Sequence, residues 1–338
     1  MSHSPKVVIS ASIAFDHIMS FSGSFKDHIL ADKAHVLSVS FLIDSLKKQR
    51  GGVGGNVAYS LGLLGEPSSL VGTVGEDFGD YRAAVEAVGV DTTGVIEVEG
   101  EYTASGFMNA DLHGNQIAAF YPGAMSSSRD IDITPWSMGA AWGIVGAGDP
   151  EAMMRHSREI AKSGCKLVFD PSQQIVILSS QQLEDGIHLA QLVVGNDYEY
   201  GMIEQKTGLT IDEIERKTEI TVVTYGEKGS EIRVGGERVT IPAASAIKIV
   251  DPTGGGDAYR AGLLKGLLAG LELEVTGRIA AQSATYAIEH HGTQEHTYSA
   301  EEFVARFDQS FPDFADRLRK EHLTARSAGA ARVAAGGH

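Results

Sequence analysis

Residues 250–270 read VDPTGGGDAYRAGLLKGLLAG, which is a β-like lead-in, three consecutive glycines, an acid and a helix of small and apolar residues. We expect the backbone N–H groups of Gly254, Gly255 and Gly256 to lie at the positive end of that helix's macrodipole. Such a turn is an anion site made from backbone alone. Asp257 suits a phosphoryl group in transfer, because it can accept a hydroxyl proton while the amides hold the phosphoryl charge.

A second interpretation of the same stretch is purely structural. Asp257 can act only as a helix N-cap, and the glycines only as a tight turn. The GGGD motif cannot separate the two interpretations, because short motifs have many false matches. The decision therefore depends on the rest of the chain.

Length and composition fit an ordinary globular protein. The 338 residues can bury a large core, as one α/β domain or as a domain with a smaller lobe. The sequence has neither a run of eighteen apolar residues nor a signal-peptide pattern, so we expect no membrane partner. The single cysteine, Cys165, argues against a disulfide framework and fits a reducing compartment, so we expect a cytoplasmic protein.

The formal net charge of −16 argues against a nucleic-acid partner, which needs clustered Lys and Arg. A phosphate ligand must then be held by local groups such as backbone amides and a divalent cation.

Alternating strand-like and helix-like segments predict an α/β fold with a mostly parallel sheet. The expected strands are 6–14, 70–75, 95–98, 141–145, 166–170, 192–194 and 220–224, and the expected later helices are 181–190, one from 196, 274–290 and 300–320. The polar residues at the expected strand ends are Asp16, Asp149, Asp170, Asn196 and Tyr225. Ligands bind at that edge of open α/β sheets, so these residues are candidates for binding.

Two stretches of the N-terminal half carry further candidates. The strand 6–14 is expected to deliver Asp16 to its C-terminal end, although a turn residue is the alternative. The stretch 50–59, RGGVGGNVAY, predicts a flexible turn that runs into a helix, with Asn56 on the first turn as a two-way hydrogen bonder. Its glycines miss the dinucleotide spacing, because Val57 stands where the third glycine belongs.

Two strand-like runs, 102–111 and 116–121, are joined by LHGN and predict a hairpin. A β-ribbon within a βα pattern suggests a small appended sheet, which can act as a lid or as a dimer clasp.

The C-terminal half carries two nucleotide-site candidates. NDYE at 196–199 has capping-box spacing, which is the structural alternative, but Glu199 could also reach a magnesium ion through waters. The stretch 222–229, VVTYGEKG, is a strand followed by Gly226 and Gly229, a turn that could lie under a nucleotide and that could equally be a simple hairpin.

Together these motifs, in this order, resemble the PfkB (ribokinase-like) carbohydrate and nucleoside kinases over nearly the whole chain. The matching residues are Gly51, Gly52 and Asn56, then Asn196 and Glu199, then Asp251 to Asp257 with Pro252 inserted and Gly255 in place of alanine. Stretches such as SIAFDHIMSFSGSF, FYPGAM, DPSQQ and HGTQE are similar to bacterial adenosine kinases of mycobacterial type and to a related group of nucleoside kinases.

This resemblance implies a ribokinase-like α/β fold, with a central mostly parallel sheet flanked by helices and a small β lid. The kinase domain is expected at 1–324, with lid segments near 10–20, 36–50 and 93–121, and a disordered tail at 325–338. The implied activity is ATP-dependent phosphorylation of the 5′-hydroxyl of adenosine, with ATP and Mg²⁺ as cofactors. A requirement for K⁺ stays open.

The resemblance also assigns roles to individual residues. Asp257 is the implied base, and Gly254 to Gly256 the implied anion hole. The implied substrate-binding residues are Ser12, Asp16 and Asn56 at the ribose hydroxyls with Gly52 lending backbone, Phe120 stacked on the base, and Gln173 and Gln174 near the base edge. The resemblance gives Ser12 no more specific role. The implied nucleotide-binding residues are Asn196, Thr224, Gly226 and Gly229, with Glu199 holding Mg²⁺ through water.

The lid departs from the resemblance at one position. The mycobacterial enzymes carry a lid phenylalanine where this chain has Gly106, with Phe107 one place on. A one-residue shift in a strand turns a side chain to the opposite face, so the base specificity is expected to be looser. The resemblance further implies a homodimer that pairs through the lid.

Alternatives remain at this point. Within the family they are a broad-specificity purine nucleoside kinase and another sugar kinase. Outside it, Gly146 and Gly148 suggest an NAD-linked oxidoreductase, which is disfavoured by Glu151 at a position that needs a small residue. A non-catalytic nucleoside-binding protein is the third class, which the intact Asp257 and glycines disfavour.

Overall fold

The computed structural model describes residues 6–28 and 39–323. The expected tail, 325–338, and the lid residues 36–38 lie outside the described residues. No helix within the described ranges is long and apolar enough to cross a membrane.

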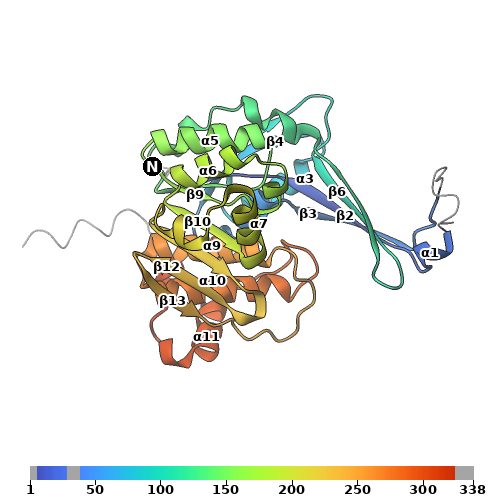
Figure 1. The fold of residues 1–338 in the computed structure, drawn as a ribbon. Helices are drawn as coiled ribbons and strands as arrows, with labels where there is room; N and C mark the ends of the chain where they lie inside the picture. Colours follow the sequence, from blue (N-terminus) through green and yellow to red (C-terminus); the bar gives the residue numbers. More distant parts are fainter. Residues whose placement is uncertain (1–5, 29–38, 324–338) are drawn as a thin grey trace, which may run out of the picture.

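The body is built on a large, mostly parallel sheet, as the alternating pattern predicts (Figure 1). Its strand order is β13-β12-β11-β10-β9-β8-β1-β4-β5, and neighbours pair in parallel except β11 with β12 and β12 with β13. The strands are β1 Val7–Ser10, β4 Ser68–Val74, β5 Asp91–Glu97, β8 Trp142–Val145, β9 Lys166–Phe169, β10 Leu192–Asn196, β11 Ile220–Thr224, β12 Ser230–Val234 and β13 Glu237–Ile241.

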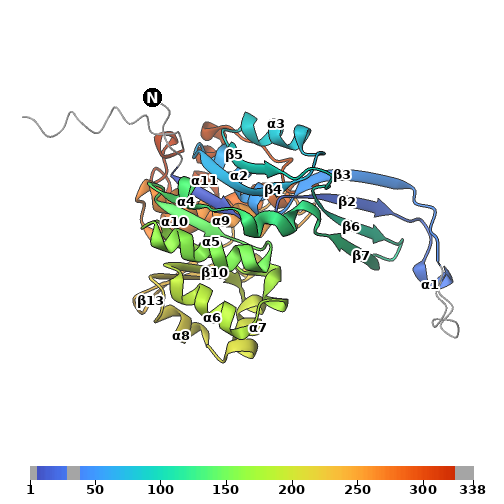
Figure 2. The same cartoon turned by 90° about the horizontal axis from the view of Figure 1, so that it is seen from above.

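Helices cover both faces of this sheet (Figures 1 and 2). One face carries α2 Val53–Leu63, α3 Gly79–Ala87, α9 Gly255–Ala269, α10 Leu273–Ile288 and α11 Ala300–Ser310. The other carries α4 Thr134–Ser137, α5 Pro150–Lys162, α6 Ser180–Leu189, α7 Asp197–Thr207 and α8 Ile211–Glu215. The short 3₁₀ helices are η2 Gly123–Asp130, η3 Ser172–Val176, η4 Gly226–Lys228, η5 Pro312–Phe314 and η6 Lys320–His322.

The apolar run of β1 shows why the sheet is covered twice. Val7 and Ile9 join the core under α2 and α9, whereas Val8 joins the core under α5 and α6. Successive side chains of a strand point to opposite faces, so a continuous apolar strand is stable only between two helix layers.

A second, small sheet has the order β3-β2-β6-β7, and we call it the lid below because it matches the appended sheet expected from the sequence. Its strands are β2 Ala14–Ser20, β3 Ser45–Gly51, β6 Ala104–Ala110 and β7 Gln116–Tyr121. It extends away from the body, with α1 Phe25–His28 at its far end (Figures 1 and 2). The predicted hairpin is confirmed, because β6 and β7 pair antiparallel.

Three expectations need correction. The segment 91–97 is β5, the edge strand of the large sheet, so the last lid segment begins at 104 and not near 93. Asp16 lies on the lid strand β2 and not at the end of the preceding strand, because Ser12 bonds through its backbone to Ala147 and Gly54 and so ends the first strand early. The helix expected over 300–320 stops at 310, because Pro312 cannot continue it.

Candidate active site

The glycine turn and Asp257 lie at the N-terminus of α9, as expected. Gly254 is the N-cap with φ +79°, a left-handed conformation that favours glycine, and Asp257 stands in the first turn. The first amides of a helix have no partner within the helix, which leaves an anion site here. One of the three is partly engaged, since the Gly255 N–H lies 3.4 Å from the Pro252 carbonyl oxygen.

The Asp257 carboxyl has a strongly shifted pKa. Burial raises the pKa of Asp257 to about 6, against the opposing effects of the Arg260 charge and of a hydrogen bond from Asn56. A carboxylate that takes up a proton near neutral pH is suited to general-base work.

Asn56 is fixed in one orientation by three partners. Its Nδ2 donates to Asp257 Oδ2 (2.8 Å), while its Oδ1 accepts from Thr293 Oγ1 (2.7 Å) and from Gln294 Nε2 (2.9 Å). Gln294 also donates to the Tyr81 hydroxyl (2.6 Å). With its oxygen fully used, Asn56 can offer a ligand only its remaining N–H, so the expected two-way hydrogen bonder is a donor here.

Asp16 lies on the lid between two glycines of neighbouring strands. A Cβ at Gly51 would stand 2.2 Å from Asp16 Oδ2, and one at Gly106 would stand 2.9 Å from Oδ1. The two glycines therefore leave room for the carboxylate and keep it accessible from that face. Burial, and second the nearby charge of Asp251, raise the pKa of Asp16.

The lid register puts Phe120 on the same face as Asp16. Asp16 pairs with Gly106, and Gly106 pairs in turn with Phe120, so the three form one row across the sheet. Phe120 is exposed. Phe107 belongs to the opposite face, where it stacks on His17 with ring centroids 4.7 Å apart.

Ser12 and Gly52 form the entry to α2. Ser12 Oγ accepts from the Val53 N–H (3.1 Å), which caps the helix. Gly52 has φ +83°, and a Cβ there would lie 2.6 Å from the Ser12 carbonyl oxygen. This glycine lets the backbone of the two segments approach closely.

Gln173 and Gln174 lie on η3, directly after β9. Gln173 is exposed, and Gln174 is partly buried. Among the described residues, Gln174 Oε1 is buried without a hydrogen-bond partner. A buried oxygen of this kind costs free energy unless a water or a ligand satisfies it.

A buried ion pair joins this loop to α9. Arg260 Nη2 donates to Asp170 Oδ1 (2.7 Å) and to Ser172 Oγ (3.2 Å), and Arg260 Nε contacts the other Asp170 oxygen. Burial favours the neutral form of Arg260, but Asp170 and Asp257 outweigh it and raise the pKa of the guanidinium.

The nucleotide-side candidates have structural roles of their own. Asn196 and Glu199 form a complete capping box at α7, which leaves the side-chain Nδ2 of Asn196 and Oε1 of Glu199 for a ligand. Burial raises the pKa of Glu199. A Cβ at Gly226 would meet open space, whereas one at Gly229 would stand 2.1 Å from the Ile241 carbonyl oxygen, so packing alone requires Gly229.

Thr224 ends β11, is partly exposed and pairs with Asn196 in the register of β10 and β11. Mg²⁺ keeps much of its water shell, so one free carboxylate oxygen, as at Glu199, fits such an ion. In residues 6–28 and 39–323 no group of three or more His, Cys, Asp or Glu side chains could hold a metal ion directly.

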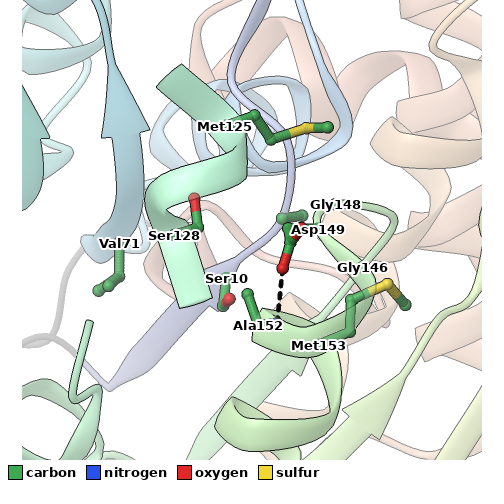
Figure 3. Close-up of a pocket in the computed structure, with 10 residues that line it drawn as sticks. Ser10, Val71, Met125, Ser128, Gly146, Gly148, Asp149, Ala152 and Met153 are labelled. Carbon is green, nitrogen blue, oxygen red and sulfur yellow. Dashed lines mark hydrogen bonds between the residues drawn. The ribbon is translucent and has the colours of Figure 1, made fainter. Parts of the chain in front are cut away.

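The near dinucleotide motif at Gly146 and Gly148 has a packing explanation. Both glycines border a small pocket with Ser10, Ser128 and Asp149 (Figure 3). Asp149 caps α5 by accepting from the Ala152 N–H (3.0 Å). A Cβ at Gly146 would lie 2.9 Å from the Val53 side chain, so this glycine is needed where the start of α2 meets the strand ends.

Several residues that organise the site were missed. Thr293 and Gln294 donate to Asn56, Tyr81 accepts from Gln294, and Arg260 contacts the loop after β9. For Arg260 the sequence did carry a signal, since it is an arginine in a helix rich in Gly, Ala and Leu. A charge in such a buried helix is stable only when it is paired, which predicts an acidic partner. The Gln294 contact spans 238 positions of sequence, and no local pattern predicts it.

The comparisons with known proteins identify the family of this chain. The profile of the PfkB family of carbohydrate kinases matches residues 16–300. A nucleoside kinase of Methanothermobacter thermautotrophicus is 34% identical over 275 residues, which cover 80% of this chain and 88% of the relative.

Solved structures support the same family. A nucleoside kinase of Burkholderia thailandensis, solved in complex with inosine, is 35% identical, with a TM-score of 0.81 and with 90% of this chain and 98% of that chain covered. A nucleoside kinase of Methanocaldococcus jannaschii, described as an archaeal member of the ribokinase family, has a TM-score of 0.82 at 26% identity, with 91% and 100% covered. The ribokinase-like fold is confirmed, and the chain belongs to the PfkB family of carbohydrate kinases.

Proposed function

We propose that this protein is an ATP-dependent nucleoside kinase that phosphorylates the 5′-hydroxyl of purine nucleosides, with adenosine as the favoured substrate. The relatives named as nucleoside kinases support the nucleoside class. A broad-specificity purine nucleoside kinase is the second candidate, and Gly106 is the observation that favours it.

The observation that carries the proposal is the environment of Asp257. Its pKa is raised to about 6, and it stands among the first amides of α9, held by the Asn56 amide. A spectator anion site would gain nothing from a carboxylate among its donors. A site that must remove a hydroxyl proton and hold phosphoryl charge needs both.

In this assignment each residue has one chemical task. Asp257 holds the 5′-hydroxyl and accepts its proton as the oxygen attacks the γ-phosphorus of ATP, and the bond from that phosphorus to the β-phosphate oxygen breaks to release ADP. The amides of Gly254, Gly255 and Gly256 bind the phosphoryl oxygens. Mg²⁺, when bound, neutralises phosphate charge, and Glu199 would hold it through water, with Asn196, Thr224, Gly226 and Gly229 along the nucleotide.

Substrate recognition is assigned to the lid and to the loop after β9. Asp16 accepts from the two vicinal ribose hydroxyls, and the remaining Asn56 N–H donates to the ribose. Ser12 and Gly52 line the substrate site, where Gly52 contributes its backbone. Phe120 stacks on the base, and Gln173 and Gln174 meet its edge. The buried, unpartnered Gln174 oxygen supports a polar contact at that edge.

Gly106 supports a tolerant base site. A Cβ at Gly106 would meet only Asp16, so the lid face between Asp16 and Phe120 carries no bulky side chain at this point. Phe107 cannot replace it, because it lies on the other face. In the broad-specificity candidate, purines with different 6-substituents would bind with similar affinity.

We further propose a homodimer through the lid. The residues of β7 are all exposed, and the exposed apolar side chains of the lid fall on both faces, Phe107 and Tyr121 on one and Phe120 on the other. An isolated sheet with two apolar faces and an open edge is stabilised by pairing with a second copy.

A substrate panel tests the function. Adenosine, guanosine, inosine, 2′-deoxyadenosine, ribose and fructose are compared with ATP and Mg²⁺ in a coupled ADP-release assay. We expect adenosine to have the highest kcat/KM, and nucleosides to exceed both sugars by at least about 100-fold. Equal rates with all purine ribonucleosides would favour the broad-specificity candidate, and a sugar as the best substrate would reject the nucleoside assignment.

A further inference from the structure

Arg260 touches both parts of the proposed site at once. A Cβ at Gly256 would stand 2.7 Å from Arg260 Nη1, so the guanidinium lies directly against the glycine turn. Its Nη2 and Nε face the loop after β9, where they contact both oxygens of Asp170. One buried side chain therefore bridges the anion turn and the loop of Gln173 and Gln174.

The loop on the other side of this bridge is held in an unusual conformation. Ser172 has φ +41°, which residues other than glycine rarely adopt. Its hydroxyl donates to Asp170 Oδ1 (2.7 Å) and accepts from Arg260 (3.2 Å). Backbone of this kind persists only where neighbouring contacts hold it, so the ion pair sets the position of the residues that follow.

We propose that Arg260 is a positioning residue that ties the base-recognition loop at 170–174 to the catalytic turn of α9, so that base contact and proton abstraction depend on one ion pair. The inference rests on the proposed function, because it takes Gln173 and Gln174 as base contacts and Asp257 as the base. It adds a role for a buried pair to which the proposed function assigns no substrate contact.

Arg260 and Asp170 shift the pKa of Asp257 in opposite directions. The positive Arg260 lowers the pKa of Asp257, and the negative Asp170 raises it. The other groups facing Asp257 are Asn56, which donates to it, and Glu199, whose charge also raises its pKa. The acid limb is the low-pH side of the pH profile of kcat/KM, where activity falls as Asp257 takes up a proton. Loss of Arg260 should therefore shift the acid limb to higher pH, and loss of Asp170 should shift it to lower pH.

The test uses the whole protein with Arg260→Gln, Asp170→Asn, Arg260→Lys and the double variant Arg260→Gln/Asp170→Asn. We expect Arg260→Gln to raise the nucleoside KM about tenfold and to move the acid limb to higher pH. Asp170→Asn should raise KM similarly but move the limb to lower pH. Arg260→Lys keeps the positive charge but loses the planar guanidinium group that contacts both Asp170 oxygens. Its acid limb should therefore stay near that of the wild type, while its KM for the nucleoside rises.

Removing one member of a buried pair can prevent folding, because it leaves an uncompensated charge. The double variant and Arg260→Lys avoid that problem. Arg233→Gln is the matched control, since Arg233 is a buried arginine on β12 that pairs with Glu231 and Asp212. It should lose stability without any change in KM or in the acid limb.

Hydrogen exchange of residues 170–176 in the ligand-free protein gives a readout independent of activity. Exchange should be faster in Arg260→Gln and Asp170→Asn than in Arg233→Gln. Unchanged exchange, or acid limbs that shift in the same direction in folded variants, would overturn the inference. If wild type phosphorylates no nucleoside, the proposed function fails, and the exchange result still decides whether Arg260 holds the loop.

Discussion

At the scale of single residues, Asp257 has the environment of a proton acceptor and not of a simple cap. Gly254 occupies the N-cap position of α9, three residues before Asp257, and the Asp257 carboxyl accepts a hydrogen bond from the Asn56 side chain. The sequence left capping and catalysis open for this residue. The structural interpretation of an N-cap is thus wrong for Asp257, whereas for Asn196 and Glu199 the capping box is present.

The raised pKa of Asp257 predicts the pH dependence of the reaction. Burial stabilises the protonated carboxyl, and only the ionised form can accept a proton, so kcat/KM should fall as the pH drops below about 6. A pH profile of kcat/KM with adenosine measures this limb. A limb near pH 4, as for an exposed aspartate, would contradict the assignment.

Asp16 should determine how tightly the ribose hydroxyls of the nucleoside are bound. We expect Asp16→Ala to weaken ribonucleoside binding by about 2–4 kcal/mol, because hydrogen bonds to charged groups contribute about 1.5–3 kcal/mol each and do not add fully. The gap between adenosine and 2′-deoxyadenosine should narrow in the same variant. Isothermal titration and kcat/KM for both nucleosides check this, and an unchanged ratio would show that Asp16 does not read the 2′-hydroxyl.

At the scale of elements, regular alternation carried much of the prediction. The strand at 220–224 is observed with the expected bounds, and α6 and β10 start or end within two residues of the expected positions. Boundaries failed where a contact from far along the sequence decides them. Ser12 ends β1 by bonding to Ala147, and no local pattern in 6–14 encodes that contact.

The entry to α2 gives a stability prediction at this scale. Gly52→Ala should lower the free energy of unfolding by about 1–3 kcal/mol, because φ is +83° and the added Cβ would stand 2.6 Å from the Ser12 carbonyl oxygen. Gly79→Ala is the control, since a Cβ there meets nothing within 4 Å at the start of α3. Urea unfolding compares them, and equal stabilities would show that the backbone at Gly52 is not constrained.

At the scale of the whole molecule, the family pattern predicted the two-sheet architecture but not the hydrogen bonds that join distant segments of the chain. The catalytic turn, α2, α3 and the segment at 293–294 meet through Asn56 and Gln294. These contacts depend on how the complete chain folds, so the sequence named Asn56 and missed its partners.

The exposed apolar faces of the lid lead us to expect a homodimer. Light scattering at micromolar concentration should give the mass of two chains, because the exposed apolar side chains on both lid faces would be covered by a second copy. Replacing Phe107 on one face by serine should weaken the dimer without a change in the fold. A mass near that of one chain, with or without adenosine, would contradict the proposed dimer.

The central claim is that Asp257 removes the proton of a nucleoside hydroxyl. The substitution Asp257→Asn keeps the shape of the side chain, and its amide oxygen could still accept from the Asn56 amide, so this variant should fold and bind adenosine as wild type does. The most direct measurement is the rate of ADP release with adenosine, ATP and Mg²⁺ for both proteins. We predict that kcat falls by at least about 100-fold in Asp257→Asn. A variant that keeps more than about a tenth of the wild-type rate would contradict the account.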